Sequence, residues 1–146
     1  MNNNVVEILI VEDNPDDEEL TLHALKRVNL INHIHVSRDG AEALDYIFGK
    51  NAQAAELENT PRLIFLDLKL PKIDGMEVLE RLKTDARTRM IPVVMLTSSR
   101  EERDVVESYQ LGVNSYIVKP VDFEQFTQSV GQAGLYWAVL NEPPRF

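Results

Sequence analysis

The chain has 146 residues, of which 44% are hydrophobic and 27% charged, as expected for one globular domain of ordinary size. Acidic residues outnumber basic ones 24 to 15, and the formal charge of −9 argues against a nucleic-acid interface, which needs a basic face. The absence of cysteine excludes disulfides, thiolate catalysis and cysteine-based zinc sites. No apolar run approaches the roughly 18–20 residues of a membrane span, and the start of the chain lacks the features of a signal peptide. We therefore expect one cytoplasmic domain over residues 1–146, with no membrane partner.

The first predicted strand is the apolar run Val5–Val11, which ends at two acidic residues. A helix start follows at once, because Asn14 is a favoured N-cap and Pro15 suits the first turn. The four acidic residues 16–19 suit the positive end of the helix dipole. Apolar residues at helical spacing predict that this helix runs to about Asn29.

A short strand, His33–Ser37, and a second helix come next. The Asp39-Gly40 pair begins this helix and Gly49 ends it. The connection Lys50–Pro61 is longer than the usual few residues between elements.

The third strand, Leu63–Asp67, is an unbroken apolar run that ends in a carboxylate. Such a run is typical of a strand buried on both faces, as in a parallel sheet under helices. A third helix is predicted from Asp74-Gly75. Pro92 then opens a fourth strand, Val93–Thr97.

The C-terminal third predicts two more helices and one more strand. Residues Ser99–Glu102 form a capping-box pattern for a helix that ends near Gly112. The strand Asn114–Val118 follows, and Asp122 begins the last helix. We expect one buried face on that helix, formed by Phe126, Val130, Ala133, Tyr136 or Trp137, and Leu140. A contact of its aromatic end with a partner or with a second copy of the chain is the alternative.

Five strands that alternate with five helices predict parallel strands joined by right-handed crossovers. The fold class is therefore α/β, a three-layer α/β/α sandwich. The core spans about residues 5–136 and a short tail spans 137–146. Only 26 residues follow Pro120, too few for a second domain.

Polar residues stand at the ends of four predicted strands: Glu12, Asp13, Asp67, Thr97 and Lys119. Parallel strands bring these ends to one edge of the sheet, where ligands of open α/β sheets bind. Three carboxylates in one place repel each other unless a cation offsets their charge, and Mg²⁺ with oxygen ligands serves this purpose. The Lys119 ammonium suits a phosphoryl group, and the Thr97 hydroxyl can donate to an anionic oxygen. The pattern predicts a carboxylate that accepts a phosphoryl group.

This set of residues resembles the motifs of the response-regulator receiver domain of two-component signalling. The motifs are Glu12-Asp13, Asp67 with Pro71 and Gly75, Thr97, and Lys119-Pro120, over about residues 5–136. The resemblance implies a CheY-like (flavodoxin-like) sheet of order 2-1-3-4-5. It also implies that Asp67 becomes an aspartyl phosphate, receiving its phosphoryl group from a phosphohistidine of a sensor histidine kinase. The protein would then be a phosphoacceptor and not an enzyme.

The resemblance assigns further roles around Asp67. Asp13, Asp67 and the backbone carbonyl of Lys69 would hold Mg²⁺ directly, whereas Glu12, where the family usually has Asp, would act largely through a metal-bound water. Thr97 would hydrogen-bond the phosphoryl oxygens.

Lys119 would pair with the phosphoryl oxygens, and its peptide bond to Pro120 is expected to be cis. Tyr116 would follow Thr97 inward and reshape the surface of the fourth helix, fifth strand and fifth helix for an unknown downstream protein. Lys69 and Ser99, two residues beyond Asp67 and Thr97, would tune the phosphoryl lifetime. The long connection and the C-terminal tail are similar to those of single-domain regulators paired with phytochrome-type kinases.

Several other functions compete with this interpretation. A haloacid-dehalogenase-type phosphatase needs a second Asp where this chain has Lys69, and a P-loop enzyme needs a glycine-rich motif that is absent. A flavodoxin-like cofactor binder needs a phosphate loop where the chain has Glu12 and Asp13. A pseudo-receiver scaffold and a phosphoryl sink without a target stay open as alternatives.

Overall fold

The computed structural model describes residues 8–30, 34–49, 57, 60–119 and 122–141. Five parallel strands form one sheet in the order β2-β1-β3-β4-β5, which confirms the predicted order. The strands are β1 (Ile8–Val11), β2 (Ile34–Ser37), β3 (Leu63–Leu66), β4 (Val93–Thr97) and β5 (Ser115–Val118). The three central strands are buried on both faces, as the apolar run in β3 predicts.

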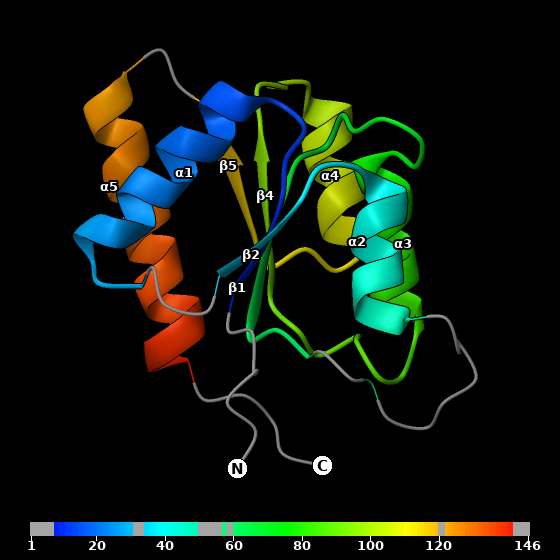
Figure 1. Cartoon of the computed structure of the whole chain (residues 1–146). Coiled ribbons are helices and arrows are strands. Elements are labelled where there is room, and N and C mark those ends of the chain that lie inside the picture. The colour runs from blue at the N-terminus through cyan, green and yellow to red at the C-terminus, as the bar shows by residue number, and fades with distance from the viewer. Residues whose placement is uncertain (1–7, 31–33, 50–56, 58–59, 120–121, 142–146) are drawn as a thin grey trace, which may run out of the picture.

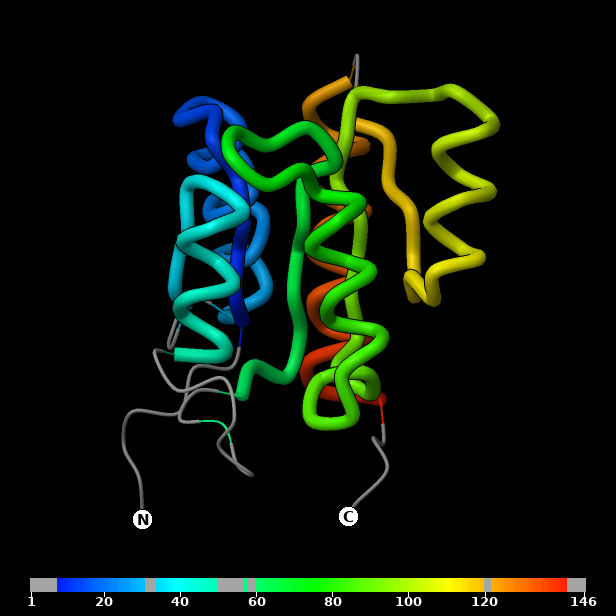
Figure 2. The backbone as a smooth tube through the Cα atoms, turned by 90° about the vertical axis from the view of Figure 1, so that its right-hand side faces the viewer, coloured from blue at the N-terminus to red at the C-terminus, as the bar shows by residue number. Residues whose placement is uncertain are grey.

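Helices cover both faces of the sheet and complete the predicted three layers (Figure 1). They are α1 (Pro15–Arg27), α2 (Gly40–Phe48), α3 (Gly75–Thr84), α4 (Glu102–Gln110) and α5 (Phe123–Leu135), followed by a π-helical turn, η1 (Tyr136–Leu140). Helices α1 and α5 pack against each other on one face, and α2, α3 and α4 lie over the other, where Figure 2 shows them in turn across the sheet. No helix within the described ranges is long and apolar enough to span a membrane.

The core divides into two layers because side chains alternate along each strand. In β1, Leu9 and Val11 pack under α2 and α3, whereas Ile8 and Ile10 pack under α1 and α5. Phe65 of β3 belongs to the second layer and is 1% exposed.

Local sequence signals explain where three of the helices begin. The Asn14 side chain accepts hydrogen bonds from the backbone N–H groups of Asp16 and Asp17 and caps α1. Asp39 and Asp122 cap α2 and α5 in the same way. These caps confirm the predicted starts.

The predicted capping box at Ser99–Glu102 is wrong. Helix α4 begins at Glu102, and its N-cap residue, Glu101, makes no side-chain cap hydrogen bond. The Ser99 hydroxyl instead donates to the Asp104 carboxylate and accepts from the Glu101 N–H. Ser99 therefore ties the β4–α4 loop to the first turn of α4 and does not cap the helix itself.

The predicted buried face at the end of the last helix is wrong at Tyr136 and Leu140, whereas Trp137, the alternative to Tyr136, is partly buried and packs against the core. Tyr136 is 49% exposed and Leu140 is 66% exposed, and the buried residue of this turn is Ala138. The π-helical turn, closed by a hydrogen bond from Asn141 N–H to the Tyr136 carbonyl, rotates the later residues out of the phase of a regular α-helix. Apolar side chains are therefore exposed at this end, and the alternative, a contact with a partner or with a second copy of the chain, stays a prediction.

Candidate functional site

Backbone hydrogen bonds between neighbouring strands place the candidate residues at one sheet edge. The N–H of Asp67 donates to the carbonyl of Val11, the last residue of β1, at 3.0 Å. The N–H of Lys119 likewise donates to the carbonyl of Thr97, the last residue of β4, at 2.7 Å. Glu12 directly follows β1, so the parallel register brings side chains distant in the sequence to the same edge.

The Lys119 ammonium is the centre of this edge. Its Nζ donates to Glu12 Oε1 at 2.6 Å, to Asp17 Oδ2 at 2.9 Å and to Asp67 Oδ2 at 2.9 Å. The Lys119 side chain is only 10% exposed, as is that of Asp67, and the Glu12 side chain is 3% exposed. An ammonium group has three N–H donors, so every donor of Lys119 is paired with a carboxylate.

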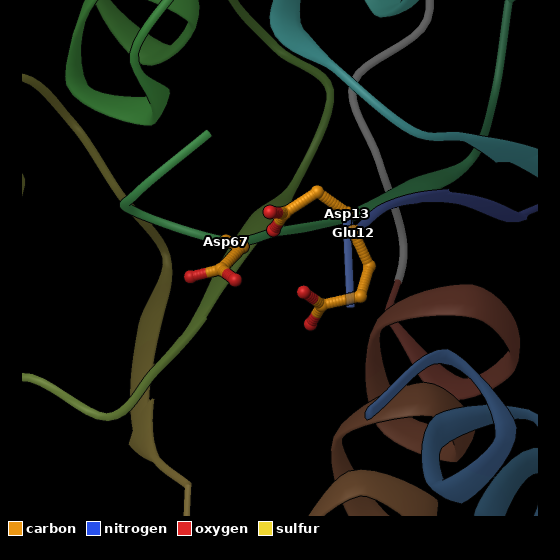
Figure 3. Close-up of side chains that lie close together, drawn as sticks. All are labelled: Glu12, Asp13 and Asp67. Carbon is orange, nitrogen blue, oxygen red and sulfur yellow. The ribbon is translucent and has the colours of Figure 1, made fainter. Parts of the chain in front are cut away.

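Glu12, Asp13 and Asp67 form an acidic trio that fits a divalent cation. One oxygen from each lies within 4.8 Å of the others, and Figure 3 shows the three carboxylates facing a common space. Two oxygens on opposite sides of a Mg²⁺ ion are about 4.2 Å apart, so carboxylates at this spacing can hold the ion directly or through a bound water after small side-chain rotations. An all-oxygen donor set is the kind that Mg²⁺ and similar hard cations prefer.

Burial and crowding shift the pKa values of two groups at this edge. Burial raises the pKa of Glu12 to about 8, and the neighbouring Asp67 carboxyl adds to the increase. Burial alone would lower the pKa of Lys119, but its hydrogen bond to Glu12 and the charge of Asp67 outweigh that effect and raise it. The edge therefore keeps its ammonium charged, and the buried Glu12 carboxyl favours its protonated form at neutral pH unless a further cation offsets its charge.

A close backbone contact fixes the loop after Asp67. Gly75 N–H donates to the Leu68 carbonyl at 2.8 Å, and a Cβ on Gly75 would lie 2.0 Å from the Asp67 carbonyl oxygen. Only glycine permits this approach, so the first residue of α3 anchors the loop that carries the central carboxylate.

Hydrogen bonds through Ser99 connect Thr97 with Tyr116. The Ser99 N–H donates to Thr97 Oγ1 at 3.2 Å, and its carbonyl accepts from the Tyr116 hydroxyl at 3.1 Å. Thr97 is 1% exposed and Tyr116 is partly buried. A change at the Thr97 hydroxyl can therefore reach β5 through one loop residue.

The model of the response regulator receiver domain family matches residues 8–131. The chain belongs to this family. As a receiver domain it is a signalling phosphoacceptor of two-component systems.

The receiver domain is similar to regulators associated with phytochromes. It is 39% identical to the response regulator Rcp1 of Synechocystis sp. over 132 residues, covering 89% of this chain and 87% of Rcp1. The crystal structure of the phosphorylated cyanobacterial phytochrome response regulator RcpA has a TM-score of 0.83 and 38% identity, covering 97% of this chain and 99% of RcpA. The bacteriophytochrome response regulator RtBRR is 55% identical, with a TM-score of 0.72, covering 96% of this chain and 84% of RtBRR. A structure of Rcp1 in its Mn²⁺-bound form, 35% identical, has a TM-score of 0.80 and covers 94% of this chain and 98% of Rcp1.

The receiver domain brings together the carboxylates and the ammonium that the sequence singles out at the strand ends. The Lys69 N–H lies 3.4 Å from Asp67 Oδ1, whereas the role of its carbonyl as a metal ligand stays a prediction. Pro120 lies outside the described residues, and so does the expected cis bond before it.

Asp17 also belongs to this edge, although the sequence predicted for it only a favourable interaction with the dipole of α1. The helical period gives the signal that could have found it. Asp17 lies four residues before Thr21 and seven before Ala24, both buried on the inner face of α1. A carboxylate on that face, in the first turn, points to the edge of the sheet.

Proposed function

We propose that this receiver domain accepts a phosphoryl group on Asp67 in a Mg²⁺-dependent reaction. The observation that carries the proposal is the combination of the acidic trio with Lys119 at the carboxyl edge of the sheet. Glu12 and Asp67 are the two members of the trio that contact the ammonium, and Asp67 is the more exposed of them, at 8% against 2%. These conditions suit a carboxylate nucleophile.

The transfer exchanges one bond to phosphorus for another. An Asp67 carboxylate oxygen attacks the phosphorus of a phosphohistidine, the new O–P bond forms, and the P–N bond breaks with its electron pair returning to the imidazole. Lys119, already within hydrogen-bonding distance of Asp67, stabilises the negative charge of the transferred group. The family relationship supports a histidine kinase as the phosphodonor.

The acidic trio would hold the metal, with Asp13 and Asp67 as direct ligands together with the Lys69 carbonyl, and with Glu12 acting through a water. Mg²⁺ supplies charge neutralisation for the acceptor carboxylate and the incoming phosphoryl oxygens. The existence of a Mn²⁺-bound form of the similar regulator Rcp1 supports binding of a divalent cation by this receiver domain.

The signal would leave the site through Thr97. The Thr97 hydroxyl would donate to a phosphoryl oxygen while its oxygen still accepts from the Ser99 N–H, so a shift of Thr97 toward the phosphoryl group would carry Ser99 with it, and Ser99 also holds Tyr116. We expect the β4–α4 loop and Tyr116 to move together, which changes the surface of α4, β5 and α5 for a downstream protein. Similarity to RcpA and RtBRR supports a phytochrome-type kinase in the cytoplasm as the partner.

Mass spectrometry after incubation with acetyl phosphate and Mg²⁺ tests the assignment of the acceptor. We expect one added phosphoryl group, no addition to Asp67→Asn, and none in the presence of a metal chelator. Asp74→Asn is a matched control, because Asp74 is exposed on the same loop and makes no side-chain cap hydrogen bond. Undiminished phosphorylation of Asp67→Asn would overturn the assignment. Transfer from an autophosphorylated phytochrome-type kinase tests the partner separately.

A further inference from the structure

We propose that Asp17 is a positioning residue that holds Lys119 in place when the acidic trio turns to the metal. The inference rests on the proposed function, because it assigns a role in the same phosphoacceptor site. It concerns an aspartate of α1 that lies outside the trio.

Asp17 reaches Lys119 because of its place in the first turn of α1. The N-cap Asn14 accepts a hydrogen bond from the Asp17 backbone N–H, which fixes the turn. The buried residues Thr21 and Ala24 set the inner face of the helix, and Asp17 continues that face to the sheet edge. Its side chain is 30% exposed, and Oδ2 lies 2.9 Å from Lys119 Nζ.

Asp17 differs from the other two partners of Lys119 in what metal binding does to it. Glu12 and Asp67 belong to the trio that faces the metal, so a divalent cation competes with the ammonium for both. Asp17 is the one Lys119 partner, among the contacts of the described residues, for which the cation does not compete. It can keep the ammonium at the edge while Glu12 and Asp67 turn to the cation.

This arrangement predicts a direct effect of Asp17 on metal affinity. Without its carboxylate, the ammonium can pair only with Glu12 and Asp67, and Mg²⁺ must displace it from both. Loss of a side chain that orients a metal-site residue typically weakens binding by about 10–100-fold. We expect about tenfold weaker Mg²⁺ binding for Asp17→Asn, with Asp17→Glu close to the wild type.

The experiment is titration of the metal-free protein with Mg²⁺ by isothermal titration calorimetry, without any phosphodonor. Asp16→Asn is the matched control, because it removes the same charge from the neighbouring position, which is exposed. We expect a change below about twofold for Asp16→Asn, since exposed charges away from a contact act weakly. Thermal unfolding checks that each variant is folded, and Asp17→Ser replaces Asp17→Asn if the latter is not.

A double-mutant cycle separates positioning from charge. If Asp17 acts through Lys119, Asp17→Asn changes Mg²⁺ affinity less than about twofold in a Lys119→Met background. A tenfold loss that persists in that background would overturn the proposal, as would equal losses for the Asp16 and Asp17 variants.

The titration also distinguishes this inference from the proposed function. If Asp17→Asn binds Mg²⁺ like the wild type while Asp67→Asn abolishes phosphorylation, only the role of Asp17 is wrong. If the wild type binds no Mg²⁺ at millimolar concentration, both are wrong.

Discussion

Replacement of Lys119 by methionine removes the only cation that the structure places among Glu12, Asp17 and Asp67 within the described residues. Methionine keeps most of the side-chain volume, so the change acts mainly on charge. Glu12 and Asp67 then lie almost fully buried without their partner, with side chains 3% and 10% exposed. In metal-free buffer, no other cationic side chain among the described residues forms an ion pair with these two carboxylates.

Removal of one partner from a buried ion pair costs about 3–5 kcal/mol of unfolding free energy. The low end applies here, because the Asp17 side chain is 30% exposed and is solvated when Lys119 is absent. We therefore expect a loss of about 3 kcal/mol at about pH 9. The pKa of Lys119 is raised, so its stabilisation is fully present at that pH in the wild type.

The loss should be smaller at lower pH. The pKa of Glu12 is about 8 in the wild type, and removal of Lys119, which lowers that pKa, raises it further. In the unfolded chain, Glu12 has its ordinary pKa of 4.5 and is already ionised above that pH. In the folded variant, Glu12 keeps its proton to a much higher pH. The unfolding free energy of Lys119→Met therefore continues to fall as pH rises above about 8, where Glu12 of the wild type has released its proton. We expect the difference in unfolding free energy between wild type and variant to be about 1 kcal/mol smaller at about pH 6 than at about pH 9.

Urea unfolding with a chelator present, at both pH values, measures the effect. Lys69→Met is the matched control, because Lys69 is exposed at the same edge, and its effect should stay within about 0.5 kcal/mol. A loss below about 1 kcal/mol for Lys119→Met, or one that is the same at both pH values, would refute the reasoning.

Three further changes test the framework around the site. Gly75→Ala would place its Cβ 2.0 Å from the Asp67 carbonyl oxygen. We therefore expect the unfolding free energy to fall by about 2–3 kcal/mol and phosphorylation to be slower. An unchanged melting temperature would contradict this close contact. Asn14→Ala removes the α1 cap and should lower the unfolding free energy, measured by thermal unfolding, by about 1 kcal/mol. Asn14→Asp keeps a capping oxygen and should change it little. Burial lowers the pKa of Lys83 to about 8, so the folded chain releases this proton before the unfolded chain does. The stability of the wild type relative to Lys83→Met should therefore increase by about 1–2 kcal/mol from about pH 8 to 10.5 in urea unfolding, and a constant difference would contradict the burial.

The order of the elements was predictable because the apolar runs and three of the helix caps agree with the global fold. Caps at Asn14, Asp39 and Asp122 mark helix starts, and the short apolar run before Asp67 is typical of a strand buried on both faces. Parallel strands then bring their carboxyl ends together, so the approach of Asp67 to Lys119 follows from topology alone.

The errors arise where tertiary contacts override a local pattern. Ser99 fits a capping box in the sequence, but its hydroxyl is engaged by Asp104 and its carbonyl by Tyr116. At the end of α5, periodicity assumes 3.6 residues per turn, whereas the π-helical turn adds a residue and leaves Leu140 exposed. The contact of Asp17 with Lys119 was missed because an acidic residue in the first turn already suits the dipole of α1, although the helical period places Asp17 on the inner face of that helix.

The central claim is that one cation and the Lys119 ammonium jointly offset the carboxylates around Asp67. A crystal structure with Mn²⁺ and beryllofluoride, which mimics an aspartyl phosphate, tests it most directly. We predict an anomalous peak among Glu12, Asp13 and Asp67, beryllium bonded to an Asp67 oxygen, and Lys119 Nζ within hydrogen-bonding distance of a fluoride. Beryllium on any other carboxylate, or a metal peak away from these three residues, would contradict the claim.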